Sequence, residues 1–177
     1  MPTDAFPIKQ MYHGSRLEPK GFTHTHHLFL PRAAQALGIL WAKAKAIPDS
    51  RSRNMLLFFV EQAVWGMSIL NRYQPIMHGR AGGSQVNRYL SGVYYIGSQI
   101  SEVSPWYNLE NKLGRLIKAF NGFSKLFNQA IIDTGTAAIF SFSANSIDYI
   151  FTDPPFGENI YYADLNFLVE SWHKVKT

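Results

Sequence analysis

The sequence predicts an α/β protein in which helix predominates and strand is confined to a short C-terminal part. Three long stretches carry apolar residues at helical spacing, and two short apolar runs near the C-terminus are separated by a turn. We therefore expect a mainly helical region over residues 1–128, with an irregular N-terminus and a glycine-rich loop. A strand–turn–strand–helix part should follow over residues 129–177. A chain of 177 residues with 46% hydrophobic and 16% charged residues suits one globular domain.

The first part of the chain is expected to contain two helices. Residues 1–29 should be irregular, because prolines and glycines interrupt every apolar period. A helix is predicted over residues 31–46, since Pro31 suits a first turn and apolar residues then recur at helical spacing. A second helix is predicted over residues 53–72. Its apolar residues surround most of the axis, so we expect burial on more than one side.

A loop and a third helix are expected next. Residues 74–105 are rich in glycine and are bounded by prolines, which predicts a loop. Within this loop, residues 93–96 could form a short strand, because they are aromatic and β-branched. The third helix is predicted from Trp106 to about Asn128, with apolar residues every three or four positions.

The C-terminal part is expected to hold two strands and a helix. Residues 129–134 and 147–152 are short apolar runs of the kind found in parallel sheets that are buried on both faces. The intervening residues contain turn formers, so the two runs should be separate strands. A last amphipathic helix is predicted from residue 162 or 163 to His173 or beyond.

A rigid polar segment directly follows the second predicted strand and consists of Asp153, Pro154, Pro155 and Phe156. Asp153 and Pro154 each precede a proline and are biased toward extended backbone, and both prolines have a fixed φ and no N–H. This stiffness presents the Asp153 carboxylate and the Pro154 carbonyl as adjacent acceptors. Ligands of open α/β sheets bind at the carboxyl ends of strands, where this segment would lie.

Two adjacent acceptors suit an exocyclic amine such as adenine N6 or cytosine N4. The lone pair of this nitrogen is delocalised into the ring, which makes the amine a poor nucleophile. Hydrogen bonds from its two N–H groups to Asp153 and Pro154 would hold the amine and favour a tetrahedral nitrogen that can attack a methyl sulfonium. Phe156 would stack on the base after the base has left the duplex. The same residues could instead form only a rigid strand exit, with Asp153 capping a turn.

The segment resembles motif IV of the amino DNA methyltransferases, which methylate adenine N6 or cytosine N4 and carry the pattern (D/N/S)PP(Y/F/W). The resemblance is closest over residues 129–172 and looser in the helical part. It implies a partial Rossmann-like methyltransferase sheet, S-adenosylmethionine as the methyl donor and DNA as the partner. The residues to which it gives catalytic roles are Asp153, Pro154, Pro155 and Phe156. Those that would line the pocket for the base are Gly157, Asn159, Tyr161 and Tyr162.

The chain departs from this family in the loop that binds the cofactor. The family uses a glycine-rich F-x-G-x-G-type loop after a strand, and this sequence contains no such loop. Residues 120–124 have the first glycine without the second, and the glycines of residues 78–84 follow no convincing strand. We therefore expect a fragment of a longer methylase, with a cofactor-binding segment outside these residues as its partner.

Charge and composition agree with a nucleic-acid partner without requiring one. The formal charge is +5, and Arg80 and Arg88 in the glycine-containing loop are candidate phosphate contacts. The chain has no cysteine, and we interpret the histidines at 24, 26 and 27 as polar loop residues, so no metal site is predicted. No apolar run is long enough to span a bilayer and no signal peptide is evident, so we expect a cytoplasmic protein without a membrane partner.

Two classes of function stay open at this point. One is a site-specific DNA methyltransferase for adenine N6 or cytosine N4, of the kind found in restriction–modification, although RNA or a protein amide would also fit the same acceptors. The other is a catalytically incomplete DNA-binding or interaction fragment that lacks the cofactor loop. Neither a phosphate-binding P-loop nor a nucleophile elbow is present, which argues against nucleotide hydrolases and serine hydrolases of those types.

Overall fold

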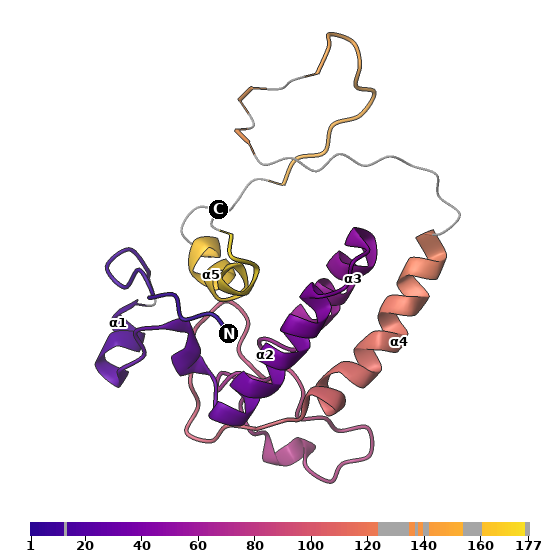
Figure 1. Ribbon diagram of the computed structural model, residues 1–177. Helices are drawn as coiled ribbons and strands as arrows, with labels where there is room; N and C mark the ends of the chain where they lie inside the picture. Colours follow the sequence, from indigo (N-terminus) through magenta and orange to yellow (C-terminus); the bar gives the residue numbers. More distant parts are fainter. Residues whose placement is uncertain (13, 124–134, 137, 140–141, 154–160, 176–177) are drawn as a thin grey trace.

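The computed structural model describes residues 1–12, 14–123, 135–136, 138–139, 142–153 and 161–175. The helices of this part of the chain are α1 (Gly14–Leu17), α2 (Pro31–Lys45), α3 (Ser50–Glu61), α4 (Pro105–Phe123) and α5 (Tyr162–His173). Short 3₁₀ turns are η1 (Glu18–Lys20), η2 (Thr25–Leu28) and η3 (Pro75–Met77). Helix α2 packs on α3, and α4 contacts both. Figure 1 shows α5 beside the N-terminal segment, and residues 142–153 extending away from the helices.

The predicted α/β class, including the partial Rossmann-like sheet, is wrong. Among the described residues, β-structure is limited to two isolated bridges, Ala5 with His24 and Arg72 with Ile100, and no sheet forms. The second predicted strand, residues 147–152, is exposed and has no strand conformation. A strand requires a neighbouring edge to satisfy its N–H and C=O groups, and no described residue supplies that edge. The first predicted strand lies outside the described residues.

Helix α2 confirms the prediction for residues 31–46. Its buried residues, Ala33, Leu37, Trp41 and Ala44, follow at intervals of three and four, which places them on one face. The chain then turns, and α3 begins after Asp49. The Asp49 carboxylate accepts a hydrogen bond from the Ser52 N–H at 2.7 Å, and this bonding lowers the pKa of Asp49.

Helix α3 differs from its prediction in length and in burial. It ends at Glu61, and residues 62–70 form successive turns. Backbone groups of these turns form hydrogen bonds that are not those of a helix. For example, the Ile69 N–H donates to the Leu28 carbonyl at 2.8 Å. Val60 is the buried residue of α3, whereas three apolar side chains on its other sides are exposed by 36–41%: Met55, Leu56 and Phe58.

The remaining predictions for the central region are mostly confirmed. Residues 74–104 form a loop that contains η3, and the expected strand over residues 93–96 is absent from it. The fully buried Asn71 holds this loop in place. Its side-chain Nδ2 donates to the Gln85 and Ser101 carbonyls at 3.0 and 2.9 Å. Helix α4 agrees with the third predicted helix as far as Phe123, where the description ends.

Helix α5 is part of the hydrophobic core and confirms the prediction for residues 162–173. Trp172 is 2% exposed and lies between two other aromatic rings. Its ring centroid is 5.8 Å from that of Phe29, in a T-shaped arrangement, and 5.2 Å from that of Trp41. Leu168, also fully buried, faces the same core one helical turn earlier.

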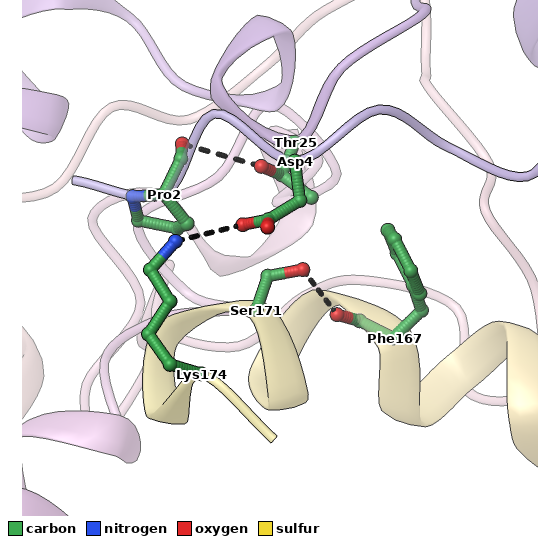
Figure 2. Close-up of polar contacts among 6 residues, drawn as sticks. All are labelled: Pro2, Asp4, Thr25, Phe167, Ser171 and Lys174. Carbon is green, nitrogen blue, oxygen red and sulfur yellow. Dashed lines mark hydrogen bonds and ion pairs between the residues drawn. The ribbon is translucent and has the colours of Figure 1, made fainter. Parts of the chain in front are cut away.

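Polar contacts also join α5 to the N-terminal segment and to α3. Beyond the end of α5, the Lys174 ammonium lies 3.0 Å from the Asp4 carboxylate. Figure 2 shows this ion pair. In the N-terminal segment, the Thr25 hydroxyl donates to the Pro2 carbonyl at 3.2 Å. On the α3 side, His173 Nε2 lies 2.9 Å from the Glu61 carboxylate. The helix that follows the proline-rich motif is therefore anchored in the helical body.

Candidate functional site

The structure describes only the first residue of the predicted catalytic motif. Asp153 is exposed and ends the described segment that extends away from the helices. The other motif residues, Pro154, Pro155 and Phe156, lie outside the described residues, as do Gly157 and Asn159. Their assignment to catalysis and to the base pocket remains a prediction from the sequence.

Tyr161 is brought onto Tyr12, a residue of the N-terminal segment. Their ring centroids are 3.9 Å apart and the ring planes differ by 6°, which is a parallel stack. Tyr12 is 52% exposed, so the stack lies at the surface. Tyr162, the other predicted pocket residue, is the first residue of α5 and is 50% exposed. The polypeptide that follows the motif is thus in contact with the first residues of the chain.

A cavity of about 290 Å³ is lined by residues of both the N-terminal segment and α5. Its lining residues are Ala5, Pro7, Gln10, Met11, Ala163, Asp164, Phe167 and Glu170. Asp164 is 6% exposed, and its backbone carbonyl accepts a hydrogen bond from the Tyr94 hydroxyl at 2.6 Å. Burial raises the pKa of Tyr94. Because Met11 directly precedes Tyr12 and Ala163 is two residues after Tyr161, cavity and stack belong to the same region.

The two candidate phosphate contacts differ in their surroundings. Arg80 is exposed in the loop. Arg88 is partly buried, and its Nε donates to the Ser84 carbonyl at 2.6 Å. The Arg88 carbonyl in turn accepts from Arg72 Nε at 3.1 Å. Arg88 therefore stabilises the loop, and Arg80 has the greater access to a polyanion.

A partly buried polar cluster lies between α4 and the turns that follow α3. The Lys112 ammonium donates to the Asn108 side-chain oxygen at 2.9 Å and to the Gln62 carbonyl. Burial, with a smaller contribution from Arg115, lowers the pKa of Lys112 to about 8. The two hydrogen bonds favour the charged amine. Because the pKa of Lys112 is nevertheless lowered, desolvation of the charge has the larger effect.

The depressed pKa of Lys112 predicts a pH-dependent stability. The folded state holds this proton less tightly than the unfolded chain, whose lysine pKa is 10.5. The free energy of unfolding should therefore rise with pH from about 8 toward 10.5. Lys112→Met should remove this slope, whereas Lys118→Met, at an exposed position of the same helix, should retain it. Urea unfolding at a series of pH values measures both, and an equal slope in all three proteins would refute the assignment.

Gly66 is required by the close approach of two asparagine side chains, the buried Asn108 and the partly buried Asn87. A Cβ at this position would overlap the Asn108 amide nitrogen and the Asn87 side-chain oxygen, both nearer than real Cβ contacts allow. We expect Gly66→Ala to destabilise the fold by about 1–3 kcal/mol through overpacking. Gly114→Ala on α4, where a Cβ meets nothing within 4 Å, is the matched control and should be neutral or stabilising. Thermal melts that lower Tm equally in both variants would contradict this account.

Three histidine rings lie together at η2. The ring centroids of His26 and His27 are 4.3 Å apart, and that of His24 is within 5.5 Å of both. Burial, together with the neighbouring imidazoles, lowers the pKa of His26. Within the described ranges, no three histidine, aspartate or glutamate side chains are arranged to hold a metal ion.

A donor site for S-adenosylmethionine does not fit the residues that the structure describes. These residues form no sheet, so no glycine-rich loop follows a strand. Gly79 and Gly82 adopt left-handed backbone in the long loop, but they belong to turns next to η3. We therefore assign no residue of the described part to the methyl donor.

Sequence reasoning missed the residues that join distant segments. Tyr12, Asp164 and Lys112 carry no motif, and their roles depend on contacts with residues far away in the chain.

Comparisons with family models, curated proteins and solved structures gave no match to this chain. Among the described residues, none of the helices combines the length and hydropathy of a bilayer-spanning segment.

Proposed function

We propose that this chain takes part in methyl transfer from S-adenosylmethionine to an exocyclic amine of adenine or cytosine in DNA. The observation that carries the proposal is the sequence Asp153-Pro154-Pro155-Phe156. Its two adjacent acceptors match the two N–H groups of such an amine, and its aromatic ring matches the face of a base. Asp153 is exposed and therefore accessible to a base.

The surroundings of α5 give secondary support. The cavity of about 290 Å³ is at the small end of the range for ligand pockets, which suits a single planar base. The Tyr12–Tyr161 stack is an aromatic surface of the kind that bases contact. In this proposal the chain binds and orients the amine, and no step is assigned to the donor.

The test is to identify the product. The purified chain is incubated with DNA and S-adenosylmethionine, and the DNA is digested to nucleosides for mass spectrometry. The proposal predicts N6-methyladenine or N4-methylcytosine, and either product decides between the two bases. Methylation at a ring carbon such as cytosine C5 would require a different mechanism and would refute the proposal.

A second candidate is a DNA-binding fragment without catalysis. The absence of a sheet among the described residues favours it, because these residues provide no donor site. The exposed Arg80 and the formal charge of +5 would then serve phosphate binding. Salt-dependent DNA binding without any methylated nucleoside in the product assay would select this candidate over the first.

A further inference from the structure

A separate cavity of about 230 Å³ is lined by the C-terminal half of α2, the end of α5 and residues 1–2. Trp41 and Lys45 line it from α2, and Trp172 and Lys174 line it from the end of α5. It shares no lining residue with the cavity of about 290 Å³ described above. A water molecule takes up roughly 30 Å³ of liquid volume, so the cavity has room for a small molecule.

The charged side chains that line this cavity are both positive. Lys45 is exposed and has no ion-pair partner within the described residues. Lys174 pairs with Asp4, and Figure 2 shows it reaching from the end of α5 toward Asp4 and Pro2. This contact occupies one of the three N–H groups of the ammonium. No aspartate or glutamate is among the described residues that line the cavity, so its lining favours an anion.

The two indole rings add hydrogen-bond donors that have no acceptor. Trp41 and Trp172 are 6% and 2% exposed, and their ring centroids are 5.2 Å apart. The Nε1 atom of each ring is buried and finds no hydrogen-bond partner among the described residues. An indole N–H can only donate, and a buried donor without an acceptor costs free energy. The residues that line the cavity are therefore rich in donors and positive charge.

The position of the two lysines has a simpler explanation that accounts for only part of this pattern. Lys45 is the last residue of α2 and Lys174 directly follows α5, and cations near a helix C-terminus interact favourably with its carbonyl groups. This effect explains each lysine separately. It does not explain why both lysines line one cavity together with two indoles that lack acceptors. The lysines would repel a cation in the cavity, whereas an anion would be attracted to both.

We propose that this cavity binds a small oxyanion of the phosphate class between Lys45 and Lys174. The two ammonium groups would donate charge-assisted hydrogen bonds to its oxygens. The same oxygens would be acceptors close to the rings of Trp41 and Trp172. The Asp4 carboxylate opposes binding, because it competes for Lys174 and repels an anion. This inference is independent of the proposed methyl transfer.

Equilibrium dialysis of the full chain against radiolabelled inorganic phosphate tests the site, with ionic strength held constant by sodium chloride. Lys45→Met should weaken binding by about tenfold, because it removes one charge-assisted contact. Lys43→Met is the matched control. It removes the same charge from an exposed position of the same helix that does not line the cavity, so the affinity should change by less than about twofold. Circular dichroism establishes that each variant is folded.

Asp4→Asn provides a variant with the opposite sign. It frees Lys174 and removes the nearby negative charge, so phosphate should bind more tightly than to the wild type. Methyl phosphate as a second ligand distinguishes the two sources of this chemistry. Tighter binding than inorganic phosphate would assign the site to a phosphate monoester, and weaker binding would assign it to the free ion.

The proposal predicts saturable binding that sulfate displaces and chloride at equal ionic strength does not. The absence of saturable binding by the folded chain would overturn it. Equal weakening by Lys43→Met and Lys45→Met would also overturn it, because the chain would then respond to net charge rather than to a site. Displacement by chloride as effective as that by sulfate would lead to the same conclusion.

Discussion

Replacement of Trp172 by alanine is expected to unfold the protein at or near physiological temperature. The indole is 2% exposed and packs against Phe29 and Trp41, so its removal leaves a large cavity where α5 meets α2 and the segment that precedes it. Truncation of a buried aromatic side chain costs about 3–5 kcal/mol, which is a large part of the stability of an ordinary domain. Thermal unfolding followed by circular dichroism measures the loss.

Trp172→Phe is the matched control. The indole Nε1 of Trp172 is buried and finds no hydrogen-bond partner among the described residues, so phenylalanine removes no hydrogen bond. It also retains an aromatic ring for the contact with Phe29. We expect Tm to fall much less for Trp172→Phe than for Trp172→Ala. An unchanged Tm for Trp172→Ala would mean that α5 is not part of the core.

Asp153→Ala is expected to lower the rate of methyl transfer by about a hundredfold or more. The variant removes the charged acceptor proposed to orient the amine, and loss of one such preorganised polar group has effects of this size. The measurement is single-turnover transfer of a labelled methyl group to DNA. Asp153→Asn retains an acceptor oxygen without the charge, so its rate should lie between those of the alanine variant and the wild type.

Asp148→Ala supplies the control for this effect. Asp148 lies in the same exposed segment and has the same charge, but it is outside the proline-rich motif. Its substitution should leave the rate near that of the wild type. Equal losses for Asp148→Ala and Asp153→Ala would show that the charge of the segment matters rather than the position of one carboxylate. An active Asp153→Ala variant would remove Asp153 from the mechanism.

The helices were predictable from the sequence because their signals are local. Pro31 and the periodic apolar residues after it define α2, and the same period locates most of α4 and all of α5. The end of α3 at Glu61 was not predictable in this way, because the turns that follow it are held against distant residues. Gly66 in these turns lies against Asn87 and Asn108, which come from parts of the chain far along the sequence.

The predicted strands failed for a different physical reason. An apolar run such as residues 147–152 has the composition of a buried strand, but its conformation depends on a partner edge that the run itself does not encode. The Tyr12–Tyr161 stack likewise results from the docking of α5 against the N-terminal segment. The motif therefore indicates a chemistry, whereas tertiary contacts determine the fold around it.

The most direct test of the central claim is whether labelling depends on the exocyclic amine. Two duplexes of equal length are incubated with the chain and labelled S-adenosylmethionine. One contains all four ordinary bases, and the other carries N6-methyladenine and N4-methylcytosine in place of adenine and cytosine, so that base pairing is kept but both target amines are already methylated. Methyl transfer to the first duplex and none to the second is the predicted result. Equal labelling of both duplexes would contradict the proposed function, and labelling of neither by the folded chain would select the DNA-binding candidate instead.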